Sequence, residues 1–407
     1  MTFGLVETLA LCSGLLFLGQ FLQRTVPGLA RVNIPAPVIG GLLAALVIVI
    51  ARVNGSPAPA FDTTLQQPLL VAFFTTIGFS ASLALLRAGG MQVVVLLVLV
   101  TGFAIVQNLL GIALALGFGL PPALGVLTGS VTLTGGPATG LAFAPMFESA
   151  GIQSAGTIAV ATAMGGIVLG GLVGGPIGSF LIARHKLRGQ IIGTTARPGV
   201  DRHDADAPPR ADDAALDEDS LRLRTALKTV AVVLIAMWVG QGISSFITSL
   251  GVTLPAYIGA MLAAAVVRNL DDRTHWLQLP HSALDLLGAV ALSFFLVMAL
   301  MTLDLTRLAS MAGPLIAMLL VQVAIVALFS LWPVFALMGR DYEAAVMTGG
   351  FLGFMLGTTA NAMAVMRTLV ERFGAAPRAF LVAPLVGAFF LDFTNALIIT
   401  AFLNILQ

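Results

Sequence analysis

Long apolar runs alternate with short polar connections along this chain. Three of the runs, Ala88–Phe147, Ser149–Ala183 and Leu308–Gly339, contain no charged residue. Each is longer than the ~20 apolar residues that span the hydrocarbon core of a bilayer. The pattern therefore predicts helices that cross a membrane.

The apolar runs predict about ten membrane-spanning helices, five on either side of one polar segment. Between the last two spans of each half lies a further apolar segment, rich in Gly and Thr, which the count of spans does not place. The predicted spans are Phe3–Leu22, Val38–Ala51, Leu69–Leu86, Val93–Leu116, Gly156–Ile182, Thr225–Leu250, Pro255–Val267, Leu284–Thr302, Pro314–Met338 and Leu381–Leu403.

The polar segment His185–Leu223 holds eight Asp and Glu residues and three prolines. This composition is typical of a solvated, disordered linker. A regulatory tail that binds a basic partner is the alternative.

The Lys and Arg residues predict the orientation, because short cytoplasmic loops carry an excess of them. With the N-terminus outside, only Arg52 and Arg307 of the 20 Lys and Arg residues fall in outside loops. We therefore expect both termini outside and the linker in the cytoplasm.

Five spans in each half mean that the second half enters the membrane in the opposite sense, which predicts an inverted repeat. Secondary transporters use such repeats to open alternately to each side of a site near the midplane. The expected units are residues 1–184, an N-terminal transmembrane repeat; 185–223, a cytoplasmic linker; and 224–407, the C-terminal inverted repeat. At shifts of 220 or 221 residues, Pro35-Ala36 matches Pro255-Ala256, Phe73-Phe74 matches Phe294-Phe295, Thr128-Gly129 matches Thr348-Gly349, Thr139 matches Thr359 and Gly166 matches Gly387.

Composition narrows the class of membrane protein. Hydrophobic residues make up 58% of the chain and charged residues only 10%, against roughly 25% in soluble domains. Two Tyr and three Trp beside 44 Gly do not supply the aromatic girdles of a membrane β-barrel. An all-α bundle, in which each helix satisfies its own backbone, is the remaining solution. A net charge of +1 gives no indication of nucleic-acid binding.

The two Gly- and Thr-rich segments are the candidates for a substrate site. We expect each to enter the membrane, break and return, because a break at membrane depth is tolerated where it lines a cavity. The freed helix N-termini would direct partial positive charge at an anion. The alternative is that these small residues only permit close helix packing. The candidate residues are Ser130, Thr132, Thr134, Gly135, Gly136 and Thr139 in the first segment, and Gly357, Thr358, Thr359 and Asn361 in the second.

Asp392 lies near the middle of the last predicted span, three residues before Asn395. An acidic side chain at that depth is costly unless it is paired or hydrated, so it indicates a functional site. Residues three apart share one helix face. The oxygen ligands suit Na⁺, a lone carboxylate could carry a proton, and a structural hydrogen bond is the third reading.

Other polar residues have two readings each. Gln107 and Asn108 could line a pathway or bridge helices, and Arg367 could position a helix or reach a substrate carboxylate. No nucleophile and base occur together in or near the membrane segments, and the four His residues fall in loops or the linker. The sequence therefore favours a carrier over an enzyme, with a lipid-processing enzyme or a passive channel as alternatives of another class.

The chain resembles the bacterial glutamate:sodium symporter family over its whole length except the linker. This resemblance implies two inverted domains with opposed re-entrant loops, Na⁺-coupled uptake of L-glutamate at the bacterial inner membrane, and a homodimer. The motifs that carry it are Pro35-Ala-Pro-Val-Ile-Gly-Gly41, Ala72-Phe-Phe-Thr-Thr-Ile-Gly78, Leu86-Arg-Ala-Gly-Gly90, Gln107-Asn108, Gly129-Ser-Val-Thr-Leu-Thr-Gly-Gly136, Glu371-Arg-Phe-Gly374 and Val386-Gly-Ala-Phe-Phe-Leu-Asp392.

The chain departs from the family's pattern in both loops. Pro137 and Ala138 stand where the family's first loop has His and Gly, and Thr358-Thr-Ala-Asn361 replaces Ala-Thr-Pro-Thr. These departures, at Pro137, Ala138, Ala360 and Asn361, lie where the family's selectivity is expected. A Na⁺- or H⁺-coupled carrier of another small carboxylate or amino acid is therefore the rival hypothesis.

Overall fold

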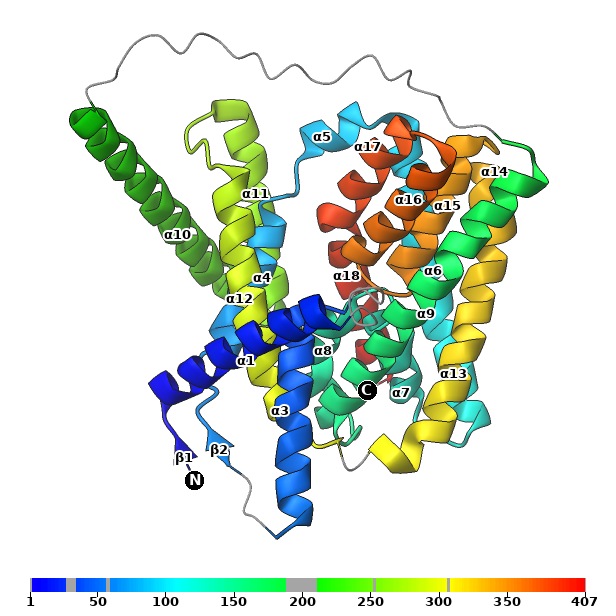
Figure 1. The fold of residues 1–407 in the computed structure, drawn as a ribbon, viewed down its shortest axis with the longest axis horizontal. Helices are drawn as coiled ribbons and strands as arrows, with labels where there is room; N and C mark the ends of the chain where they lie inside the picture. Colours follow the sequence, from blue (N-terminus) through cyan, green and yellow to red (C-terminus); the bar gives the residue numbers. More distant parts are fainter. Residues whose placement is uncertain are drawn as a thin grey trace.

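The chain folds almost entirely into helices. The exception among the described residues is a parallel pair of two-residue strands, β1 (Thr2–Phe3) and β2 (Ala60–Phe61). Seven of the described helices are long and apolar enough to cross a membrane, which confirms an all-α membrane protein (Figure 1). The computed structural model describes residues 2–26, 34–55, 59–187, 211–251, 254–305 and 308–406.

In the described part of the chain, three segments of π-helix, η1, η3 and η4, interrupt the regular helices. Before the linker the helical elements are α1 (Leu5–Thr25), α3 (Ala36–Val53), α4 (Gln66–Gly78), α5 (Leu83–Ala88), α6 (Gly90–Gly117), α7 (Pro122–Val126), η1 (Leu127–Val131), α8 (Gly136–Ser149) and α9 (Ala155–Arg184). After it they are α10 (Ala211–Ser249), α11 (Ala256–Thr274), α12 (His281–Met301), α13 (Leu308–Phe329), η3 (Ser330–Val334), α14 (Phe335–Leu337), α15 (Tyr342–Met355), α16 (Thr359–Phe373), α17 (Pro377–Leu385), η4 (Val386–Phe390) and α18 (Leu391–Leu406).

Seven of the ten predicted spans coincide with the seven long apolar helices, and the other three fall on α4, α11 and the α17–α18 stretch. The single span predicted over Leu69–Leu86 is wrong, because α4 ends at Gly78 and the chain turns before α5. The end of α4 packs closely against α11. A Cβ added to Gly78 would lie 2.5 Å from the carbonyl oxygen of Met261 in α11.

The linker is helical where the structure describes its second part. Residues 211–223 form the beginning of α10, so the expected disorder is wrong there, whereas residues 188–210 lie outside the described residues. This stretch is rich in Ala and Leu, which favour helix, and its Asp and Glu residues are favourable near a helix N-terminus.

The helices pack as two groups, each with members from both halves of the chain. In the first group, α1, α3 and α4 pack with α10, α11 and α12. In the second group, α6 to α9 pack with α13 and α15 to α18. Figure 1 shows the first group on the left and the second on the right, with the candidate segments α8, α15 and α16 in the second group.

Candidate functional site

The first candidate segment breaks between α7 and α8. Within η1, Gly129 has non-helical backbone angles (φ −93°, ψ −128°), and the chain turns before α8 begins. Gly136 starts that helix with φ +70°, a conformation that favours glycine. The hydroxyl-bearing side chains of this break are all buried; they are Ser130, Thr132, Thr134 and Thr139.

The second candidate segment breaks between α15 and α16. Thr358 caps α16, and its hydroxyl accepts a hydrogen bond from the backbone N–H of Asn361 at 3.4 Å. Thr359 donates from Oγ1 to the carbonyl oxygen of Gly387 in η4, at 2.8 Å. Thr358 and Thr359 are only partly buried and Ala360 is exposed, so this break is more open than the first.

The two breaks meet each other. A Cβ added to Gly136 would lie 2.8 Å from Cγ2 of Thr358 and 3.4 Å from the carbonyl oxygen of Gly357. The N-termini of α8 and α16 are therefore adjacent. Helix N-termini carry unsatisfied N–H groups and partial positive charge, so two of them at one place favour an anion.

Gln107 of α6 joins the two breaks. Its Oε1 accepts a hydrogen bond from the hydroxyl of Thr134 at 2.5 Å, and its Nε2 donates to the carbonyl oxygen of Met355 at 2.7 Å. Nε2 of Gln322 in α13 donates to the backbone oxygen of Gln107 at 3.1 Å. Of the two readings of Gln107, this structure displays the bridging one.

Ser130 is held from both sides by amide side chains. Its N–H donates to Oδ1 of Asn108 at 2.9 Å, and its carbonyl oxygen accepts from Nδ2 of Asn395 at 3.0 Å. Among the described residues, Ser130 Oγ, Thr132 Oγ1, Asn108 Nδ2 and Asn395 Oδ1 are buried without a hydrogen-bond partner. Buried polar atoms are nearly always bonded, so these four are free to bind a ligand.

Asp392 lies on α18 one turn before Asn395 and is partly buried. The side chain makes no hydrogen bond or ion pair with the described part of the chain. No group of three His, Cys, Asp or Glu side chains that could hold a metal ion occurs among the described residues. A cation bound beside Asp392 would therefore need amide, hydroxyl or carbonyl oxygens for its other ligands.

The remaining candidates lie on α16. The Asn361 side chain is buried and donates from Nδ2 to the carbonyl oxygen of Ile167 in α9 at 3.5 Å, while its Oδ1 has no partner among the described residues. Arg367 is exposed, two turns beyond Thr359, and is not brought to the breaks.

Sequence reasoning missed several groups that hold the site. Gln322 is fully buried, and a lone amide within the uncharged run Leu308–Gly339 was the signal that could have found it. The backbone oxygens of Met355, Gly387 and Ile167 gave no such signal, because any residue type supplies them.

Comparison with known proteins agrees with this geometry. Residues 1–375 match the family model described as sodium/glutamate symporter. The sodium/glutamate symporter of Escherichia coli (strain K12) is 38% identical over 399 residues, which cover 98% of this chain and 97% of the relative. That of Haemophilus influenzae is 37% identical over 396 residues, 97% of this chain and 96% of the relative. This chain belongs to the sodium/glutamate symporter family.

Proposed function

We propose that this chain imports L-glutamate across the bacterial inner membrane by symport with Na⁺. Its family consists of symporters, and two relatives that align over nearly the whole chain are named sodium/glutamate symporters, so it is a carrier rather than an enzyme. The observation that carries the proposal is the meeting of the α8 and α16 N-termini beside buried, unpartnered hydroxyls. That arrangement suits a carboxylate.

The proposed architecture is a pair of inverted repeats, residues 1–184 and 224–407, joined by the linker 185–223, with both termini outside. Equivalent close helix crossings support it. A Cβ added to Gly19 in α1 would lie 2.1 Å from the Ala36 carbonyl oxygen in α3, and one added to Gly240 in α10 would lie 2.2 Å from Cα of Ala260 in α11. Gly19 and Gly240 are related by the 221-residue shift.

In this architecture the two breaks are opposed re-entrant loops around the substrate. The substrate carboxylate would accept hydrogen bonds from the helix N-termini and from the Ser130 and Thr132 hydroxyls, which have no partner among the described residues. Gln107 and Asn108 would fix the first loop, and Arg367 would lie along the exposed approach on α16. The proposed substrate residues are Ser130, Thr132, Thr134, Gly135, Gly136, Thr139, Gly357, Thr358, Thr359 and Asn361.

The proposed Na⁺ site uses Asp392 and Asn395. Asp392 lies one turn before Asn395 on α18, and its carboxylate has no hydrogen-bond or ion-pair partner in the described part of the chain. Asn395 supplies an Oδ1 without a partner among the same residues, while its Nδ2 is bonded to Ser130. A carboxylate at membrane depth is stabilised by a cation bound next to it. Substrate and Na⁺ would thus share the Ser130 segment, which gives a physical route for their coupling.

A second candidate function is the transport of another small carboxylate or amino acid, coupled to Na⁺ or H⁺. The residues that favour it are Pro137, Ala138, Ala360 and Asn361, which depart from the family's pattern. Ala360 is exposed at the more open break, where it could contact a substrate.

The test is uptake into vesicles that contain the purified full chain. We expect an inward Na⁺ gradient to accumulate labelled L-glutamate, and an unlabelled excess of the true substrate to abolish accumulation. Uptake that does not depend on the Na⁺ gradient but follows a pH gradient would show that the coupling ion is H⁺ rather than Na⁺. If another unlabelled carboxylate competes more strongly than unlabelled glutamate, that carboxylate is the substrate. Crosslinking of the chain in native membranes tests the proposed homodimer.

A further inference from the structure

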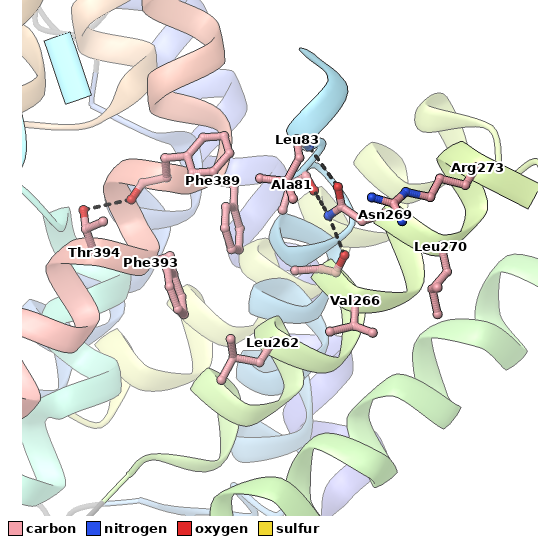
Figure 2. Close-up of a pocket in the computed structure, with 12 residues that line it drawn as sticks. Ala81, Leu83, Leu262, Val266, Asn269, Leu270, Arg273, Phe389, Phe393 and Thr394 are labelled. Atoms are coloured by element: carbon pink, nitrogen blue, oxygen red, sulfur yellow. Dashed lines mark hydrogen bonds between the residues drawn. The ribbon is translucent and has the colours of Figure 1, made fainter. Parts of the chain in front are cut away.

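A cavity of about 550 Å³ lies between the two helix groups, and we call it the seam cavity (Figure 2). One wall comes from α11 of the first group and the turn that follows α4. The other wall comes from η4 and α18 of the second group. Its volume lies within the range of pockets that bind small molecules. The apolar walls include Leu262, Val266, Leu270, Phe389, Phe390 and Phe393.

Asn269 and Arg273 lie at one rim of the seam cavity, whereas Thr394 lies on the opposite wall, where its hydroxyl donates to the Phe390 carbonyl oxygen at 2.8 Å (Figure 2). Asn269 is fully engaged there, because its Oδ1 accepts from the N–H of Leu83 at 2.9 Å and its Nδ2 donates to the Ala81 carbonyl oxygen at 2.6 Å. Arg273 follows one helical turn later, and Figure 2 shows its guanidinium on the side of Asn269. The cavity thus has an apolar interior and a single cation at its rim.

Arg273 has no partner in the described part of the chain. Its neighbour Arg268, by contrast, forms an ion pair with Asp272 at 2.9 Å. Three residues beyond Arg273, the side chain of Trp276 is 83% exposed. Exposed Trp residues of membrane proteins concentrate at the membrane–water interface, so Arg273 lies at the level of lipid headgroups.

We propose that the seam cavity binds one anionic phospholipid, with its phosphate on Arg273 and an acyl chain between α11 and α18. The charge of the headgroup complements the unpaired guanidinium, and the acyl chain matches the apolar walls. Basic pockets between membrane helices bind anionic headgroups for the same reason. A lipid in this position contacts both helix groups at once, so it would influence any movement of one group against the other.

Native mass spectrometry of the purified full chain tests the proposal without a transport assay, so its outcome is independent of the substrate. The chain is mixed with phosphatidylglycerol and phosphatidylcholine that carry identical acyl chains. We expect the wild-type chain to retain phosphatidylglycerol preferentially. Arg273→Gln should weaken that retention about fivefold, the loss expected for one basic residue near an anionic surface, and should leave phosphatidylcholine unchanged.

The matched control is Arg184→Gln, which removes an exposed Arg from the last turn of α9, outside the seam cavity. Equal retention of both lipids by the wild-type chain, an unchanged Arg273→Gln variant, or an equal loss in Arg184→Gln would each overturn the proposal. A phosphatidylglycerol with a photoreactive acyl chain gives a second test on the wild-type chain. Its crosslinks should map to residues 262–273 and 389–394, and crosslinks confined to other helices would refute the site.

Discussion

The two breaks at the centre of the second helix group are built from similar residues but are held in different ways. The first break is buried, and Gln107, Asn108 and Asn395 from two other helices bond to it. The second is capped by its own Thr358, and it is bonded to η4 through Thr359, to α9 through Asn361 and to Gln107 of α6 through the Met355 carbonyl oxygen. The first break is therefore enclosed by its surroundings, whereas the second is capped within its own segment and is partly exposed at Thr358, Thr359 and Ala360.

This difference indicates which break can move at lower cost. Local opening requires the least free energy where few buried contacts must be broken and the backbone is partly exposed. Thr358 and Thr359 are partly buried and Ala360 is exposed. We therefore expect the second break to open first and the first break to act as the rigid side of the proposed site.

The charge beside the two breaks differs as well. At the 221-residue shift, Asp392 on α18, the helix that bonds to the first break through Asn395, corresponds to Gly171 on α9, where an added Cβ would lie 3.7 Å from Oδ1 of Asn361. Under the proposed function, Asp392→Asn should abolish Na⁺-driven accumulation of glutamate in vesicles, because the variant lacks the carboxylate that would neutralise the ion. Asp285→Asn, at an exposed position on α12, is the control and should accumulate glutamate normally. Normal accumulation by Asp392→Asn would refute the assigned ion site.

The contact between the breaks can be tested at Gly136. Gly136→Ala should destabilise the protein by about 2–5 kcal/mol, since a positive φ costs an L-residue about 1–2 kcal/mol and overpacking adds about 1–3. Gly119→Ala is a matched control, because Gly119 has φ +69° and nothing within 4 Å of an added Cβ. Thermal unfolding in detergent measures both variants.

A second substitution, at Thr358, tests whether the destabilisation of Gly136→Ala comes from the contact between the two breaks. Thr358→Ser removes the Cγ2 atom that an added Cβ on Gly136 would meet at 2.8 Å. The double variant should therefore recover part of the stability that Gly136→Ala loses. Equal destabilisation in Gly136→Ala and Gly119→Ala would show that the two breaks are not in close contact.

Gln107→Leu should loosen both breaks together. It leaves the Thr134 hydroxyl and the Met355 carbonyl oxygen without their partner. Two hydrogen bonds between membrane helices give an expected loss of about 1–3 kcal/mol in the free energy of unfolding. Gln322→Leu removes one hydrogen bond, from Nε2 of Gln322 to the backbone oxygen of Gln107, and should lower the free energy of unfolding by about half as much. A loss in Gln107→Leu no larger than in Gln322→Leu would contradict the bridge.

The positions of the breaks could be predicted from the sequence because their cause is local. Gly129 and Gly136 adopt backbone angles that ordinary helical residues avoid, and Gly-Gly-Pro is a strong signal of such a point. The family resemblance was also correct: six of its seven motifs lie within residues 1–375, which the family model matches, and the named relatives align over 97–98% of the chain.

The partners of the breaks could not be predicted, because they are set by distant parts of the chain. Gln107 and Met355 are 248 residues apart, and from the residues alone Gln107 could equally line a pathway or bridge helices. Helix α4 likewise ends at Gly78, where α11 packs closely against it, although the apolar composition of the sequence continues past that residue. Hydropathy records how apolar a segment is, and it does not record which helix lies beside it.

The smallest expected effect tests the mobility of the second break directly. Thr358→Val keeps the shape of the side chain and removes the oxygen that caps α16, a change worth about 1 kcal/mol at helix N-caps. Hydrogen exchange of residues 356–361 should become about fivefold faster, while residues 129–136 keep their protection, because that segment is buried and is bonded to α6 and α18 through Ser130 and Thr134. Thr368→Val, an exposed site on the same helix, should change neither segment. If both breaks instead exchange faster together in Thr358→Val, they open as one unit, and the distinction between a rigid and a mobile side does not hold.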